Sequence, residues 1–226
     1  MSGQYFTEEA FEFLSALAVN NERAWFKANK KRYESAIREP FQRLLSDLAE
    51  PIKQISPEFV ASPKTVGGSL FRIHRDTRFS NNKTPYKTHA GAVIFHQLKG
   101  QPAPCFYLHI SPSECFFGGG IYHPPSPTLR AIRDFLVDNP KSWERARDRV
   151  IANGMRFGGD SLIRPPRGFA ADHPLIEDLK RKSFVVSTEI SHEQVLSDQF
   201  PDWFINQAEQ TAPLVDYLCA ALDLPF

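Results

Sequence analysis

The spacing of hydrophobic residues changes twice along this chain, and these changes limit the folds open to it. Over 7–55, large apolar residues recur every three or four positions, which is the period of an amphipathic helix. Four short runs then follow, rich in aromatic and β-branched residues and typical of strands: SLFRIHR, THAGAVIFHQ, PCFYLHIS and ECFFGGG. Helical spacing returns over 127–222. Helices followed by strands and then by helices predict an α+β fold.

We predict a single α+β domain over residues 1–226, because no linker rich in Gly and Ser divides the chain. Helices are expected over 7–55, the sheet core over 69–120, and helices with one further strand, SFVVSTEI, over 127–222. The connector HQLKGQPAP is too short for a crossover helix between parallel strands. The sheet, of about four to five strands, is therefore expected to be mostly antiparallel and flanked by N-terminal and C-terminal helices.

Composition favours a globular protein with its own core, since 42% of the 226 residues are hydrophobic and 23% are charged. The three cysteines form no CxxC pair and suit a reducing compartment. The N-terminus has no basic patch followed by an apolar run, and no apolar stretch approaches the length of a membrane span. We expect a soluble, cytoplasmic protein with no membrane partner. A net charge of only +1 argues against a wholly basic nucleic-acid binder.

The densest charge lies in FRIHRDTRFSNNKTPYKTH, residues 71–89, which contains five Lys and Arg residues and two His. Arg supplies a planar fork of donors and Lys a compact charge, and together they hold phosphate or carboxylate groups. Asp76 is expected to orient one Arg, and Phe79 to anchor the segment in the core. The alternative is a solvated connection whose charges keep the molecule soluble. The candidate ligand-binding residues here are Arg72, Arg75, Asp76, Arg78, Lys83, Tyr86 and Lys87.

A second candidate is FFGGGIYHPP, where three glycines follow a predicted strand. Glycines permit positive φ and let a ligand approach backbone N–H groups. The pattern is neither a P-loop nor a Rossmann fingerprint, and the alternative is a bulge that ends a strand. Gly118, Gly119, Gly120 and Tyr122 complete the predicted ligand site.

Alternation along the strands predicts a polar sheet face. In PCFYLHIS, Tyr107 and His109 are out of phase with the apolar residues, and in SLFRIHR, Arg72 and His74 are out of phase with Phe71. If the apolar sets share the buried face, these four polar side chains share the other. The alternative is an ordinary solvated face of an antiparallel sheet. Because imidazole titrates near neutrality, the candidate catalytic residues are His109, Tyr107 and His74.

No metal site is expected, because the seven histidines form no HExxH or HxH pattern and the cysteines have no ligand spacing. The sequence indicates no particular cofactor and leaves open the oligomeric state and whether the protein is an enzyme. Two functions remain. The first is binding of an anionic small molecule or nucleotide, with or without catalysis. The second is a non-enzymatic module that docks an acidic protein or nucleic acid, of which nucleic acid is the weaker prospect.

Six blocks of the chain, in the same order, resemble a family of conserved hypothetical proteins, domain of unknown function 2461. They include FLSALAVNNERAWFKANKKRY (13–33), FRIHRDTRFSNNKTPYKTH (71–89), YLHISP, GGGIYHPP, LRAIR and PRGFAADHPLIEDLKRKSF (166–184). The chain departs from the family pattern at His74, where an aromatic is usual, and at Asn82, where an acid is usual. The resemblance implies no activity, cofactor or substrate. The residues that match the family motifs are Asn20, Asn21, Arg23, Trp25, Phe26, Lys30, Arg72, Arg75, Asp76, Arg78, Lys83, Tyr86, Lys87, Gly119 and Gly120.

Overall fold

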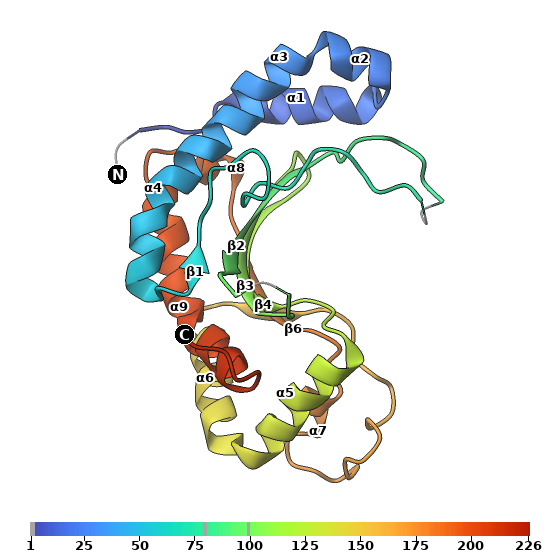
Figure 1. Cartoon of the computed structure of the whole chain (residues 1–226), viewed down its shortest axis with the longest axis vertical. Coiled ribbons are helices and arrows are strands. Elements are labelled where there is room, and N and C mark those ends of the chain that lie inside the picture. The colour runs from blue at the N-terminus through green and yellow to red at the C-terminus, as the bar shows by residue number, and fades with distance from the viewer. Residues whose placement is uncertain (1–2, 79–80, 99) are drawn as a thin grey trace.

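The computed structural model describes residues 3–78, 81–98 and 100–226. Figure 1 shows a curved sheet with two long helices on one side and no helix against its opposite, concave face. The helices over these residues are α1 (Glu8–Val19), α2 (Arg23–Ala28), α3 (Lys30–Tyr33), the π-helix η1 (Glu34–Arg38), α4 (Glu39–Ile55), α5 (Ser126–Asp138), α6 (Pro140–Ala152), α7 (Ile176–Leu179), α8 (His192–Val195) and α9 (Phe200–Ala220). The α+β fold class and the antiparallel sheet are therefore confirmed.

The sheet has six antiparallel strands among the described residues, in the order β1-β2-β3-β4-β6-β5. They are β1 (Phe59–Val60), β2 (Ala90–His96), β3 (Cys105–Ile110), β4 (Cys115–Ile121), β5 (Arg156–Gly158) and β6 (Phe184–Glu189). The sequence predicts four to five strands. The two that it missed, β1 and β5, are two and three residues long, too short to show an alternating pattern.

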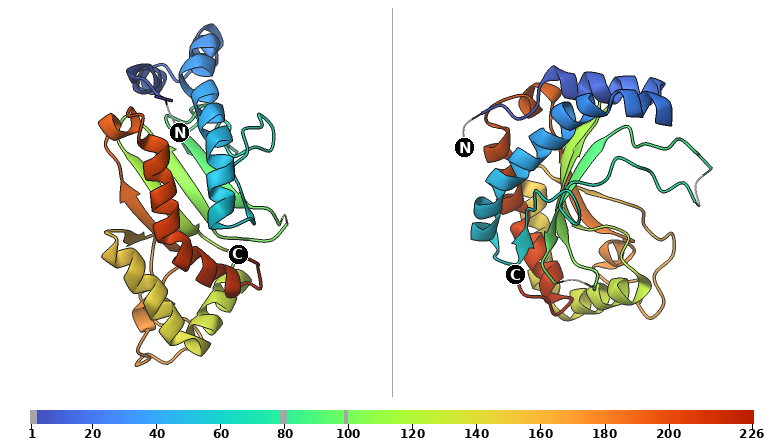
Figure 2. Two further views of the ribbon diagram at one scale, coloured as in Figure 1. Left: turned by 90° about the vertical axis from the view of Figure 1, so that its left-hand side faces the viewer. Right: turned by 45° about the horizontal axis from the view of Figure 1, so that its top comes forward.

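The core lies between the convex face of the sheet and helices α4 and α9, which run side by side across it (Figure 2). In β3, Phe106, Leu108 and Ile110 are buried on this face, while the alternate residues are only partly buried. Phe117 of β4 packs against Phe204 of α9, with ring centroids 5.2 Å apart. The alternation predicted for this strand is therefore observed.

The first predicted strand, over 69–75, is wrong. Only residues next to Leu70 pair with β2: the Phe71 N–H donates to the Gly91 carbonyl, at 2.9 Å, and Leu70 bridges Ala92. The chain then leaves the sheet. Phe71 is consequently 44% exposed rather than buried, and the predicted phase relation between this segment and β3 does not hold.

The segment 72–89 is here called the basic arm, and its described residues, 72–78 and 81–89, project beyond the sheet edge (Figure 1). The two limbs of the arm pair with each other near its base, where His74 bridges Tyr86. Backbone bonds from Arg75 N to Pro85 O, at 2.9 Å, and from Lys87 N to Ile73 O, at 2.8 Å, extend this short ladder. The described part of the arm is thus an irregular hairpin and not a strand of the main sheet.

Candidate functional site

The base of the basic arm is fastened to the first helices by an asparagine. The Asn21 side chain donates to the Tyr86 carbonyl and accepts from the Tyr86 N–H, both at 3.0 Å. The Phe26 ring stacks on the Tyr86 ring at 4.2 Å, and His74 meets Phe26 edge to face. We call Asn21, Phe26 and Tyr86 the clamp. His74 and Tyr86, both predicted site residues, pack here and line none of the three cavities described below.

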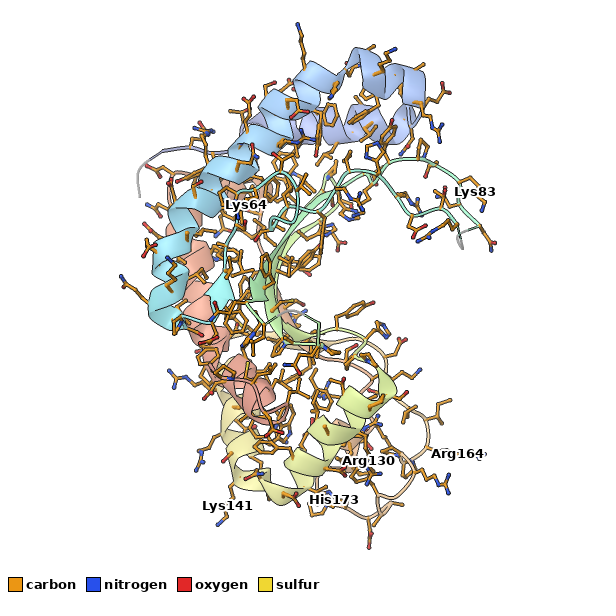
Figure 3. The ribbon with its side chains drawn as sticks, in the orientation of Figure 1. Lys64, Lys83, Arg130, Lys141, Arg164 and His173 are labelled. Carbon is orange, nitrogen blue, oxygen red and sulfur yellow. The ribbon has the colours of Figure 1, made fainter. Side chains whose placement is uncertain are left out.

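The far end of the arm carries cations that interact within the arm itself. Arg78 pairs with Asp76, with Nη2 and Oδ2 2.7 Å apart, and Lys83 donates to the Thr77 carbonyl at 2.9 Å. Lys83 lies far out on the arm, away from the sheet (Figure 3). The predicted site residues Arg78 and Lys83 therefore do not join the cavities at the sheet. Phe79, expected to anchor the arm, lies outside the described residues.

Two other cations lie where the arm returns to the sheet. Arg75 donates to Thr84 Oγ1 at 3.0 Å, and Lys87 Nζ lies 5.1 Å from the centre of the Phe71 ring. Neither cation belongs to an ion pair in the part of the chain that the structure describes. Burial, followed by the charge of Arg72, lowers the pKa of Lys87. Arg75, Asp76, Lys87, Thr88 and His89 line a recess of about 390 Å³, here called the cationic recess.

A groove of about 580 Å³ occupies the concave face of the sheet. Its floor comes from β2, β3, β4 and β6, and Phe71 and Tyr122, which lie outside these strands, also line it. Its lining is mainly apolar and includes Phe71, Val93, Tyr107, Phe116, Gly118 and Val185. Cys105 also lines the groove, but burial raises its pKa to about 11, so it is a thiol rather than an activated nucleophile.

Gly118, Gly119 and Gly120 line the groove from inside β4, not from a turn after it. Gly118 faces Tyr107 on β3 and Ser187 on β6, so the glycines pair with strands on both sides. The prediction that they offer backbone N–H donors to a ligand is therefore wrong, because those groups are used in the two ladders.

His89 and His109 each line the groove and at least one neighbouring cavity. His89 stacks on His109 at 4.5 Å, and His109 stacks on Phe116 at 4.8 Å with nearly parallel rings. Tyr107 Oη lies 3.1 Å from His109 Nδ1, and Glu114 Oε1 lies 4.0 Å from His109 Nε2. Burial raises the pKa of Tyr107 to about 12, and the carboxylate favours a proton on Nε2. We therefore assign the phenol as the donor to Nδ1.

Both imidazoles are neutral near pH 7. Burial lowers the pKa of His109. Burial, together with the nearby His109, Lys87 and Arg75, lowers the pKa of His89 to about 4, and Glu114 opposes this shift only in part. A negative group placed beside His89 would reverse the electrostatic part of the shift.

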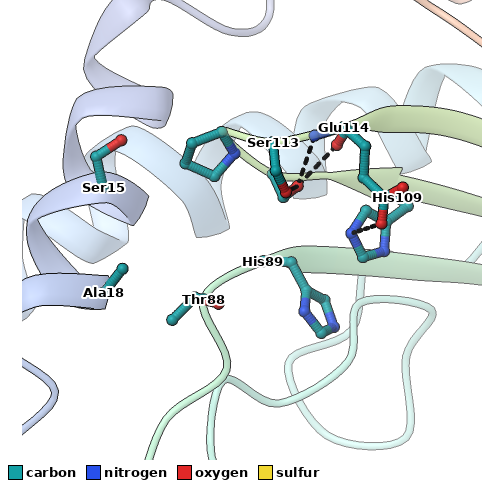
Figure 4. Close-up of a pocket in the computed structure, with 9 residues that line it drawn as sticks. Ser15, Ala18, Thr88, His89, His109, Ser113 and Glu114 are labelled. Atoms are coloured by element: carbon teal, nitrogen blue, oxygen red, sulfur yellow. Dashed lines mark hydrogen bonds and ion pairs between the residues drawn. The ribbon is translucent and has the colours of Figure 1, made fainter.

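A third cavity, of about 590 Å³, adjoins the groove and is here called the polar recess. Figure 4 shows it between α1 and the start of β2, with His89 and His109 on one side and Glu114 above them. Its lining includes Ser15, Thr88, Ser111, Ser113 and Glu114. His89 lines all three cavities, and His109 lines two of them.

The structure thus divides the predicted site. Tyr107, His109, the three glycines and Tyr122 line the groove, whereas Arg75, Asp76 and Lys87 line the cationic recess. Arg72 lies apart from both, in a small surface depression next to Tyr33 and Arg38. His89, Phe116 and Glu114 line the cavities but are not among the residues predicted from the sequence, and Phe71, expected in the core, lines the groove. Of these residues, only His89 could have been identified from the sequence, because it is the last residue of the basic segment 71–89.

Within residues 3–78, 81–98 and 100–226, no group of three or more His, Cys, Asp or Glu residues could hold a metal ion. Over the same residues, no helix combines the length and the apolar character needed to cross a membrane. No curated protein matches the chain. The model of the family described as conserved hypothetical protein (DUF2461) matches residues 9–217, and the chain belongs to this family.

Proposed function

We propose that this protein binds a small molecule bearing a phosphate or carboxylate group, held where the cationic recess meets the groove. Lys87 and Arg75 would contact the anionic group, and His89 would lie beside it. The observation that carries the proposal is the position of these two cations, which have no carboxylate partner among the described residues and lie next to a concave cavity.

Lys87 carries a half-buried charge that has no carboxylate partner among the described residues. Its ammonium lies against an aromatic ring, half-buried, and burial disfavours its charged form. In most folded proteins such a charge is paired, because an unpaired charge removed from water costs free energy. A ligand phosphate or carboxylate would supply the missing pair, and Arg75 would add a planar fork of donors.

Tyr107 and His109 are the candidate proton-transfer groups toward a ligand in the groove. The phenol is protonated and the imidazole neutral near pH 7, so Tyr107 Oη could take a proton from a ligand in the groove as its own proton passes to His109 Nδ1 over 3.1 Å. Glu114 would stabilise the imidazolium that results. This pair supports an enzymatic role without identifying a reaction.

Thermal unfolding in the presence of phosphate, acetate, sugar phosphates and nucleotides tests the proposal, since a ligand that binds only the folded state raises Tm. Lys87→Ala should weaken binding of the best ligand about 10- to 100-fold, the effect of losing one charge-assisted hydrogen bond. Lys83→Ala is the matched control, because it removes the same charge from the same arm, away from the cavities. No Tm shift with any compound, or equal losses in the two variants, would contradict the proposal.

The second candidate from the sequence, a module that docks an acidic protein or nucleic acid, is favoured by one observation. Arg78 and Lys83 are both exposed, and Lys83 lies far out on the arm (Figure 3). If they form the contact, retention on single-stranded nucleic acid should fall steeply with salt and should be lost in a variant carrying Arg78→Ala and Lys83→Ala. Retention that this variant keeps would exclude Arg78 and Lys83 as the contact.

A further inference from the structure

The floor of the groove contains a glycine that the fold does not require. A Cβ atom built at Gly118 would lie 3.6 Å from the Val186 carbonyl oxygen and 3.9 Å from Phe116 Cε2 and Tyr107 Cβ, all ordinary van der Waals distances. Gly118 does not adopt a positive φ. A glycine inside a strand costs about 0.5–1 kcal/mol relative to alanine, and neither steric crowding nor backbone conformation accounts for this cost at Gly118.

The two following glycines have structural explanations, which makes Gly118 stand apart. A Cβ atom at Gly119 would overlap Thr211 Cγ2 of α9 on the convex face. Gly120 has a φ of +119°, and a Cβ atom there would overlap the Phe184 carbonyl oxygen. On the concave face, Gly91 is also explained, because a Cβ atom there would lie 2.5 Å from Tyr107 Oη. The vacant position at Gly118 opens directly into the groove.

Aromatic side chains surround this vacant position. Tyr107 and Phe116 flank Gly118 on the floor, with ring centroids 5.8 Å apart. Phe71 is 44% exposed and Tyr122 is 68% exposed, and both line the same groove. Single exposed hydrophobic residues are ordinary, but several aromatic rings around one cavity form a surface that suits another planar ring.

We infer that the bound anion carries a planar aromatic ring, and that this ring lies on the sheet over Gly118 among Phe71, Tyr107 and Phe116. The inference rests on the proposed function, since Lys87 and Arg75 would hold the anionic end of the same molecule. The geometry agrees, because Lys87 Nζ lies on the Phe71 ring and Phe71 lies 6.1 Å from the Tyr107 ring. A side chain at 118 would occupy the place of the ligand ring.

Two kinds of molecule share this chemistry, a nucleoside monophosphate and an aromatic carboxylic acid. The groove, at about 580 Å³, lies in the range of cavities that enclose ligands of either size. The test therefore uses matched pairs that differ in the ring: adenosine 5′-monophosphate with ribose 5-phosphate, phenyl phosphate with inorganic phosphate, and benzoate with acetate. Titration calorimetry gives Kd for each compound with the whole chain.

In at least one pair, the member with the ring should bind about 5- to 100-fold tighter, the range expected for stacking one ring on aromatic side chains. The pair in which this occurs identifies the anionic group. Gly118→Val, and Gly118→Ala as a smaller change, should lower this ratio towards one and leave the affinity for the ring-less member unchanged. Gly158→Ala is the control, since its Cβ atom meets only Val185 Cγ2, at 4.0 Å, and Gly158 does not line the groove.

The outcomes separate the inference from the proposed function. Equal affinities within every pair would overturn the inference and leave anion binding standing. No measurable binding of any compound would overturn both. A ratio that stays high in a folded Gly118→Val protein would overturn the placement of the ring over Gly118. The melting temperatures of the Gly118 variants show that they fold, and Gly118→Ala should melt no lower than the parent.

Discussion

Replacing Asn21 by alanine should release the basic arm from the helices that hold it. The Asn21 side chain makes two hydrogen bonds of 3.0 Å with the backbone of Tyr86, a residue that is 5% exposed. A net contribution of about 1 kcal/mol for each bond gives a loss of about 2 kcal/mol. The variant also leaves a buried N–H and carbonyl without partners, so this figure is a lower bound unless water enters.

Amide hydrogen exchange at Tyr86 measures this loss directly, because Asn21 Oδ1 is the acceptor of the Tyr86 N–H. A loss of about 2 kcal/mol corresponds to exchange about 30-fold faster. Asn21→Asp separates the two bonds: it keeps the acceptor for the N–H and removes the donor to the carbonyl, so exchange at Tyr86 should change less than in Asn21→Ala.

Asn20→Ala is the matched control for the clamp. Asn20 Nδ2 donates to the Ala16 carbonyl, at 2.9 Å, in an exposed position at the end of α1, and does not contact the arm. Its loss should leave exchange at Tyr86 unchanged and lower the free energy of unfolding by less than about 1 kcal/mol. Unchanged exchange at Tyr86 in Asn21→Ala would refute the clamp.

Two further predictions concern the sheet. The pKa of His89 is lowered to about 4 in the folded state, so the unfolded chain binds a proton first as the pH falls, and the free energy of unfolding should decrease from about pH 6.5 to pH 4. In urea unfolding, His89→Gln should remove about 1 kcal/mol of this decrease, a figure reduced because water screens the half-buried ring. An unchanged pH profile in this variant would count against the shift. Gly119→Ala should lower the free energy of unfolding by about 1–3 kcal/mol, because the added methyl group overlaps Thr211 Cγ2. Equal stability of Gly119→Ala and Gly118→Ala would contradict the difference in steric room between the two glycines.

The fold class could be predicted because the periods of the sequence are local properties. Phe106, Leu108 and Ile110 are buried in β3 as their alternation indicates. The segment 71–75 alternates as well, yet the chain leaves the sheet after Phe71 and pairs across the arm, where Lys87 N donates to Ile73 O. Alternation reports that a backbone is extended with one side buried, and it does not report which strand lies beside it.

The candidate site was predicted only in part, because its contacts depend on strand register. His89 reaches His109 because Gly91 of β2 is opposite His109 of β3, a pairing that the connector between these strands does not determine. For the same reason the sequence did not show that Gly118 lies opposite Tyr107 inside the sheet. Residue types identified the basic segment and the glycines, but the cavity between them is a tertiary feature.

The clamp also explains why only some cations of the arm face the sheet. Asn21 fixes the backbone at Tyr86, and β2 begins at Ala90, where the ladder with β3 fixes it again. The three residues between these points, Lys87, Thr88 and His89, are held from both ends, and Arg75 is tied to the same place by its bond to the Pro85 carbonyl. Arg78 and Lys83 lie beyond the clamp and are positioned by contacts within the arm. Asn21, which lines none of the three cavities described above, therefore sets the position of the residues that would meet the anion.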